Sequence, residues 1–214
     1  MTGPTSELLD VLEESRALGF LGPGPIRPQY DHALSFLEAL AGRARVLDLG
    51  SGGGLPGLVL ASELRETQFV LLDGQKRRCS FLSRAVDALA LSDRVQVELG
   101  RAEELARRED LRGAFDAVVS RSFGSPAVTA ECAVGFLAGP GSVLVISEPP
   151  TGSSRRWPID GLAQLGLRPA ERRSGEHGTV QQVDVVESCS DRYPRRVGIP
   201  TKRPLFHVEQ VEGA

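Results

Sequence analysis

The sequence contains few of the residues that build metal centres and disulfide frameworks. Its 214 residues include only three cysteines and three histidines, which lie far apart rather than at metal-ligand spacing. A sparse, odd number of cysteines is typical of a reducing compartment, so we expect a cytoplasmic protein without a metal site. No apolar run approaches the roughly 20 residues that a membrane helix requires. Residues 1–10 also lack the basic and apolar regions of a secretory signal.

Net charge is small as well, at −3, which would argue against nucleic acid if the charge were evenly spread. The basic residues are clustered, however, and local patches decide whether a protein binds a polyanion. Two groups are candidates for such contacts: Arg192, Arg195, Arg196, Lys202 and Arg203 near the C-terminus, and Lys76, Arg77 and Arg78 in the first half of the chain. The alternative for the C-terminal group is a solvated tail that serves solubility.

Strand-like and helix-like segments alternate along most of the chain. We expect a helical segment over residues 1–43, an α/β domain over 44–188 and a basic, proline-rich tail over 189–214. Strands are predicted at 44–49, 68–72, 94–98, 115–120, 141–146 and 179–187, with another near 166–173. Helices are predicted at 6–18, about 28–40, and near 56–65, 75–90, 102–109, 125–137 and 156–165. This alternation favours a doubly wound, mostly parallel sheet, with the last strand antiparallel near an edge. Prolines disfavour regular structure in the tail, which we expect to be extended and partly mobile.

A glycine cluster follows the first predicted strand. The segment 46–57 reads Val-Leu-Asp-Leu-Gly-Ser-Gly-Gly-Gly-Leu-Pro-Gly, as expected where a buried strand enters a tight turn that passes close to a ligand. Its register is ambiguous. Gly50-x-Gly52-x-Gly54 is the glycine loop of methyltransferases, whereas Gly52-x-Gly54-x-x-Gly57 fits the dinucleotide-binding fingerprint.

Asp73 stands at the end of the second predicted strand, about 20 residues after the glycine cluster. An acid at this position is placed to accept hydrogen bonds from ribose hydroxyls. The alternative is a cap for the helix that starts near Gln75. The order of strand, loop, helix, strand and acid favours a nucleoside-bearing cofactor, and S-adenosylmethionine and NAD both fit it.

Two charged residues follow later strands of the predicted sheet. Glu103 follows the third strand, where an acid can bind the exocyclic amine of an adenine, or can simply favour the start of a helix. Arg121 follows the fourth strand and should lie beside the glycine loop, because ligands of open α/β sheets bind outside the carboxyl ends of the strands. There it could bind a carboxylate or a phosphate, unless it is an ordinary surface residue.

Four segments carry a resemblance to a known family. They are Asp-Leu-Gly-Ser-Gly-Gly-Gly-Leu-Pro-Gly at 48–57, Leu-Leu-Asp-Gly-Gln-Lys-Arg-Arg-Cys-Ser-Phe-Leu at 71–82, Val-Ser-Arg-Ser-Phe at 119–123 and Arg-Tyr-Pro-Arg-Arg-Val-Gly-Ile-Pro-Thr-Lys-Arg-Pro-Leu at 192–205. Together they resemble the GidB (RsmG) family of bacterial methyltransferases of small-subunit ribosomal RNA. The resemblance implies a Rossmann-like class I methyltransferase fold with seven strands and N-terminal helices. It also implies S-adenosyl-L-methionine as cofactor and N7 of one guanine in 16S rRNA, or in the assembled small subunit, as target. We expect a monomer.

The resemblance also assigns residues. The cofactor residues would be Gly50, Ser51, Gly52, Gly54, Leu55, Asp73, Ala102, Glu103 and Arg121, and the two basic groups named above would contact RNA. No catalytic base is assigned, because N7 of guanine carries a free lone pair and no proton, so methyl transfer can rest on proximity and orientation.

The chain departs from the family pattern in two places. After the fifth strand, where relatives usually have a lysine and a glycine, it has Ile-Ser-Glu-Pro at 146–149, and Glu148 should weaken the attraction to phosphate. The segment 30–35 is only loosely similar to the family's basic, histidine-bearing segment. Two alternatives follow: a degenerate methyltransferase-fold protein that binds RNA or assists ribosome assembly, or an NAD(P)-dependent oxidoreductase. The latter would need a proton-handling residue, and no Tyr-x-x-x-Lys motif is present.

Overall fold

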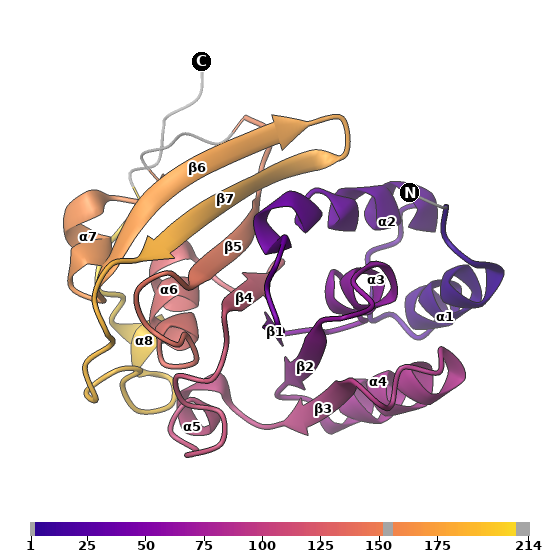
Figure 1. The fold of residues 1–214 in the computed structure, drawn as a ribbon, viewed down its shortest axis with the longest axis horizontal. Helices are drawn as coiled ribbons and strands as arrows, with labels where there is room; N and C mark the ends of the chain where they lie inside the picture. Colours follow the sequence, from indigo (N-terminus) through magenta and orange to yellow (C-terminus); the bar gives the residue numbers. More distant parts are fainter. Residues whose placement is uncertain (1–2, 152–155, 209–214) are drawn as a thin grey trace.

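The computed structural model describes residues 3–151 and 156–208 and is built around one seven-stranded sheet (Figure 1). The strands are β1 (Arg45–Leu49), β2 (Gln68–Asp73), β3 (Val95–Leu99), β4 (Ala117–Ser120), β5 (Val143–Glu148), β6 (Leu167–Gly175) and β7 (Gly178–Val185). The helices are α1 (Ser6–Ala17), α2 (Ile26–Leu34), α3 (Gly57–Glu63), α4 (Lys76–Ala88), α5 (Ala102–Leu105), α6 (Pro126–Val134), α7 (Ile159–Ala163) and α8 (Ile199–Lys202), with a 3₁₀ helix, η1, at Leu37–Leu40. None of these helices is long and apolar enough to cross a membrane.

The sheet has the strand order β3-β2-β1-β4-β5-β7-β6. The first five strands are parallel, and β7 is antiparallel to both β5 and β6. The predicted seven-stranded, mostly parallel sheet with an antiparallel final strand is therefore confirmed, and the expected strand near 166–173 is β6. The strand order reverses between β1 and β4, and such a switch point opens a crevice at the carboxyl ends of the strands.

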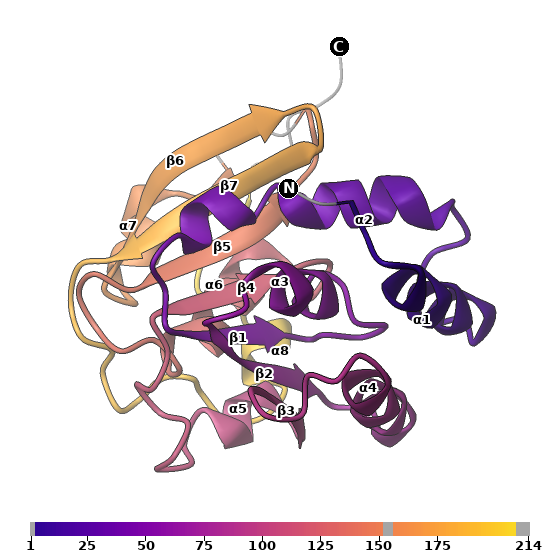
Figure 2. The ribbon, with the colours of Figure 1, turned by 45° about the vertical axis from the view of Figure 1, so that its right-hand side comes forward.

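Helices cover both faces of the sheet (Figures 1 and 2). Side chains alternate along the strands, so Val46, Phe69 and Leu71 pack with α1, α2, α3 and α4, whereas Leu47, Val70 and Leu72 pack with α5, α6 and α7. The N-terminal helices thus share a core with the sheet. The single helix expected over about 28–40 is divided into α2 and η1, and the Ser35 hydroxyl donates to the carbonyl of His32 at the division.

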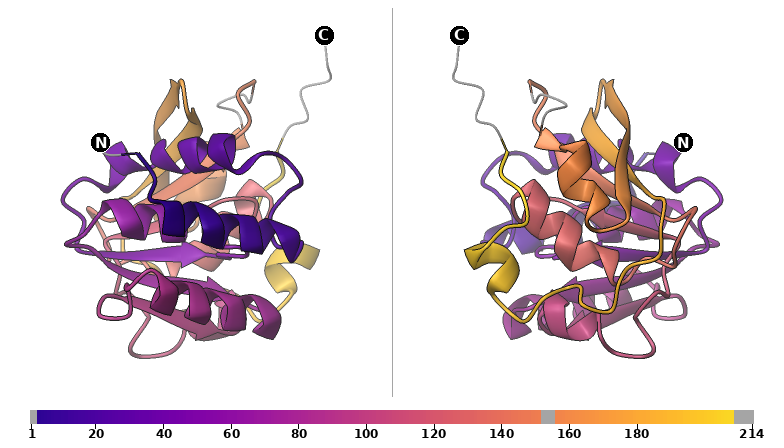
Figure 3. Two further views of the ribbon diagram at one scale, coloured as in Figure 1. Left: turned by 90° about the vertical axis from the view of Figure 1, so that its right-hand side faces the viewer. Right: turned by 90° about the vertical axis from the view of Figure 1, so that its left-hand side faces the viewer.

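The C-terminal segment is docked on the domain. Tyr193 is buried in the core formed with α6, Pro200 is buried, and α8 lies beside α6 (Figure 3). The expectation of an extended tail is therefore wrong for residues 193–202. The prolines do exclude a central strand, but buried side chains and paired charges hold this segment in place, which local propensity does not reveal.

Candidate active site

The glycine loop has the conformation that only glycine adopts readily. Gly50, Gly52 and Gly54 have φ values of +75°, +55° and +99°, in the left-handed region. The backbone N–H groups of Gly50 and Ser51 both donate to the carbonyl of Leu72, at 2.9 Å each. A Cβ on Gly50 would lie 2.6 Å from Cδ2 of Phe123. The methyltransferase register therefore matches the conformation of the turn, whereas Gly57 starts α3.

Asp73 accepts a hydrogen bond at the start of α4, close to the capping role that the sequence left open, while its ribose role stays a prediction. It is buried, its Oδ1 accepts the N–H of Gln75 at 2.8 Å, and its Oδ2 accepts the N–H of Gly52 at 3.0 Å. It thus holds the start of α4 and the glycine loop together, with Arg78 Nη1 3.5 Å from Oδ2. A carboxylate offers about four acceptor sites, so capacity remains for ligand hydroxyls in the cavity that Asp73 lines.

Glu103 lines the same cavity, which has a volume of about 240 Å³ and extends from Gly50 to the buried Ala102. Its carboxylate is buried and accepts the backbone N–H of Gly198 at 3.0 Å, with Arg101 Nη2 3.4 Å away. Burial alone would raise the pKa of Glu103, but these hydrogen bonds hold it below its usual value. Glu103 therefore lines the cavity as a carboxylate, and it also stands in the first turn of α5, the alternative role that the sequence left open.

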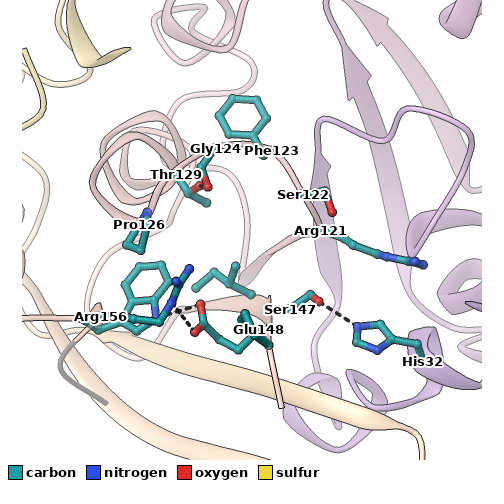
Figure 4. Close-up of a pocket in the computed structure, with 13 residues that line it drawn as sticks. His32, Arg121, Ser122, Phe123, Gly124, Pro126, Thr129, Ser147, Glu148 and Arg156 are labelled. Atoms are coloured by element: carbon teal, nitrogen blue, oxygen red, sulfur yellow. Dashed lines mark hydrogen bonds and ion pairs between the residues drawn. The ribbon is translucent and has the colours of Figure 1, made fainter. Parts of the chain in front are cut away.

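Two further cavities continue the cleft. One, of about 180 Å³, is lined by Ser51, Gly52, Leu55 and Arg121, and the other, of about 350 Å³, by Arg121, Glu148 and neighbouring residues (Figure 4). We call the former the glycine-loop cavity and the latter the distal cavity. Ser122 lines all three cavities, which therefore adjoin along the carboxyl edge of the sheet.

Arg121 lies where the glycine-loop cavity meets the distal cavity. Its Nη1 is buried and has no hydrogen-bond partner among the described residues. Burial lowers the pKa of Arg121, and the Asp48 carboxyl group opposes this shift. His32, from α2, lines the distal cavity and contacts Ser147 Oγ through Nε2 at 2.8 Å. Burial and Arg121 lower the pKa of His32. A guanidinium with unused donors thus faces the cleft, as expected for a group that binds an anion.

Asp48 is a site residue that the sequence analysis did not select. It is fully buried beneath the glycine loop, where its Oδ2 accepts the N–H of Gly57 at 3.0 Å and its Oδ1 has no partner in the described part of the chain. Burial raises the pKa of Asp48 to about 7. Gly57 has no Cβ because one would collide with this carboxyl group. The feature of the sequence that could have identified Asp48 is that it is the single acid inside an apolar strand.

The structure also alters the interpretation of Glu148. The negative charge does not stand alone, because Arg156 Nε lies 2.7 Å from its Oε2 and the indole of Trp157 donates to its Oε1 at 3.2 Å. The effect expected from the sequence, a weakened attraction to phosphate, is thereby offset by an arginine in the same cavity.

The predicted RNA-contacting residues fall into two classes. Arg195 is used internally, since its backbone N–H, Nε and Nη2 all bind the fully buried Glu131, at 2.9, 2.7 and 2.6 Å. Arg78 is half-buried beside Asp73. The others have exposed side chains that can meet a polyanion: Lys76, Arg77, Arg192, Arg196, Lys202 and Arg203.

Solved structures share this fold. The chain superposes on an O-methyltransferase from Bacillus cereus in complex with SAH with a TM-score of 0.60 and 16% identity, covering 86% of this chain and 93% of that one. For the O-methyltransferase TomG from Streptomyces achromogenes, in complex with SAM, the TM-score is 0.61 at 15% identity, covering 87% and 92%. The chain therefore has the Rossmann-like fold of S-adenosylmethionine-dependent methyltransferases.

Sequence comparison is more specific. The ribosomal RNA small subunit methyltransferase G of Deinococcus deserti is 35% identical over 174 residues, which are 78% of this chain and 70% of that protein. Its counterpart from Synechococcus sp. (strain RCC307) is 33% identical over 170 residues, 75% of this chain and 70% of that protein. The sequence model of GidB, rRNA small subunit methyltransferase G, matches residues 30–148, more than half of the chain. This chain therefore belongs to the GidB family.

Proposed function

We propose that this protein transfers a methyl group from S-adenosyl-L-methionine to N7 of a guanine in 16S rRNA. The observation that carries this proposal is the continuous cleft at the β1/β4 switch point. It combines a positive-φ glycine loop, two buried carboxylates and a guanidinium whose Nη1 has no hydrogen-bond partner among the described residues. Membership of the GidB family supports the rRNA target. We place the reaction in the cytoplasm and expect the chain to act as a monomer.

The residues of the cleft fit this cofactor. The backbone from Gly50 to Leu55 would pass along it, Asp73 would accept hydrogen bonds from the ribose, and Ala102 and Glu103 would border the adenine. Arg121, whose buried Nη1 has no partner in the described part of the chain, would bind the carboxylate of the cofactor. When bound, the cofactor supplies an electrophilic methyl group on a sulfonium centre.

The chain's own contribution is to position the reactants. N7 of guanine presents a lone pair and needs no base, so holding two reactants in line accounts for much of the rate. Arg121 and Ser122 line both the glycine-loop cavity and the distal cavity, and Phe123 packs over Gly50. These residues would fix the distance between methyl group and base.

Exposed basic residues would hold the RNA backbone. Arg192, Arg196, Lys202 and Arg203 belong to the C-terminal segment that hydrogen-bonds to Glu103 through Gly198. Arg77 lies over the ring of Phe20, which lines the glycine-loop cavity. The two basic groups would therefore approach the cleft from different elements, a suitable arrangement for folded RNA.

Methyl transfer to ribosomal particles tests the proposal. Purified protein and radiolabelled S-adenosylmethionine are incubated with small subunits, or with bare 16S rRNA, from cells lacking the gene, and 7-methylguanosine is mapped by chemical cleavage. We expect one modified guanine. Cofactor and RNA binding without transfer would instead support a degenerate RNA-binding protein. Thermal stabilisation by NAD but not by S-adenosylmethionine would support an oxidoreductase.

A further inference from the structure

The distal cavity contains a carboxylate that the cofactor does not need. Glu148 ends β5 and is only 4% exposed, yet it lines the cavity that continues from the cofactor cleft past Arg121 and Ser122 (Figure 4). Of the residues proposed to bind the cofactor, Arg121 alone lines this cavity. It has a volume of about 350 Å³ and lies at the carboxyl edge of the sheet, where the second substrate must approach.

Glu148 is held in place but is not saturated. Trp157 donates to Oε1 at 3.2 Å, and Arg156 balances the charge from 2.7 Å. Arg156 Nε lies 2.7 Å from Oε2 but outside hydrogen-bond geometry, and this buried oxygen has no other partner within the described residues. An ionised carboxylate has about four acceptor sites, so Glu148 retains capacity to accept hydrogen bonds from a bound group.

We propose that Glu148 is a specificity-determining residue that accepts hydrogen bonds from N1–H and the N2 amino group of the target guanine. This inference rests on the proposed function and adds the feature that selects the base. Both groups are donors on one edge of guanine, whereas adenine has an acceptor at N1 and no amino group at C2. A carboxylate therefore fits guanine and opposes adenine. N7 and O6 lie on the other edge of the ring, so the methyl acceptor stays free.

The fluorescence of Trp157 provides a direct readout of ligand binding at Glu148. Trp157 is the only tryptophan of the chain, is 2% exposed and is hydrogen-bonded to Glu148. The full-length protein, with S-adenosylhomocysteine bound, is titrated with GMP, IMP and AMP while tryptophan fluorescence is recorded. We expect affinity to fall from GMP to IMP, which lacks the N2 amino group, and again to AMP. A good two-point contact discriminates by about 1–3 kcal/mol, or roughly 5- to 150-fold between GMP and AMP. Equal affinities, or no response to GMP at millimolar concentration, would overturn the proposal without using any variant.

Glu148→Gln then assigns the preference to this side chain. We expect the GMP preference over AMP to disappear, while S-adenosylmethionine affinity stays within twofold of the wild-type value. Glu171→Gln is the matched control, since Glu171 is also paired with an arginine, Arg173, but lies on β6 and is exposed. A GMP preference that survives in Glu148→Gln would refute the assignment. Methyl transfer to small subunits by a wild-type protein that binds GMP and AMP equally would refute this inference alone and leave the proposed function intact.

Discussion

The carboxylate of Glu103 accepts a 3.0 Å hydrogen bond from the backbone N–H of Gly198, 95 residues further along the chain. Glu103 also lines the cavity assigned to the adenine. The C-terminal segment, with its basic residues, is thus fastened to the wall of the proposed cofactor site. Arg195 fastens it a second time, to the buried Glu131 on α6.

Variants of Glu103 and Glu131 should distinguish the roles of these two attachments. Loss of a hydrogen bond to a charged group costs about 1.5–3 kcal/mol, so Glu103→Ala and Glu131→Ala should each speed amide hydrogen exchange in residues 198–202 by about tenfold or more. Only Glu103→Ala should also weaken S-adenosylmethionine binding, as measured by calorimetry. Equal cofactor affinity in both variants would remove Glu103 from the adenine site.

The ribose role of Asp73 can be tested apart from its structural role. Asp116 is the matched control, because its Oδ2 accepts the backbone N–H groups of Ala44 and Arg45 at the opposite edge of the sheet, both at 2.9 Å. Asp73→Asn and Asp116→Asn should both lower stability, but only Asp73→Asn should weaken cofactor binding, by about 1–3 kcal/mol. Unchanged calorimetric affinity in Asp73→Asn would leave Asp73 with its structural role alone.

Gly50→Ala should damage the cofactor site rather than only strain the backbone. Gly50 has φ +75° with Phe123 2.6 Å from a Cβ, whereas Gly42 has φ +72° with open space around it. Each substitution to alanine should cost about 1–2 kcal/mol of stability from the left-handed conformation. Only Gly50→Ala should also lose cofactor affinity, because Phe123 must move. Urea unfolding and calorimetry on both variants give the comparison.

Asp48 should make stability depend on pH near neutrality. Its pKa is raised by burial from 3.8 to about 7, so its contribution is full below about 4 and is lost as pH rises through 7. Of the nearby charged groups, Asp73 raises the pKa of Asp48 further and Arg121 lowers it. Asp48→Asn removes the titration and should gain about 1 kcal/mol relative to wild type between pH 6.5 and 8. Parallel stability curves for the two proteins would show that Asp48 does not titrate there.

The exposed basic residues should determine the salt dependence of RNA binding. Neutralising Arg192, Arg196, Lys202 and Arg203 should reduce the slope of log affinity against log salt by roughly 0.7–0.9 for each lost phosphate contact. A control with glutamine at Arg65, which is exposed just before β2 near the amino edge of the sheet, should keep the wild-type slope. Indistinguishable slopes in the two variants would exclude the C-terminal residues as phosphate contacts.

The sequence by itself determined the fold and which residues meet at the glycine-loop end of the cleft. These features depend on local order along the chain: alternating apolar segments, glycines where the turn needs positive φ, and Asp73 at a strand end. The carboxyl ends of parallel strands meet at one edge, so the sequence order of strands and loops was sufficient to bring Gly50, Asp73, Glu103 and Arg121 together.

Only the tertiary structure decided how charges are shared between distant segments. The pairing of Arg195 with Glu131, the bond from Gly198 to Glu103 and the contact of Arg156 with Glu148 each depend on which side chains packing brings within about 3 Å. Local propensity predicted an extended C-terminal segment. In the structure, the burial of Tyr193 holds this segment against the domain. Asp48 and Glu148 show the same limit, because the burial that determines their chemistry is a property of the surrounding fold and not of the residues beside them in the chain.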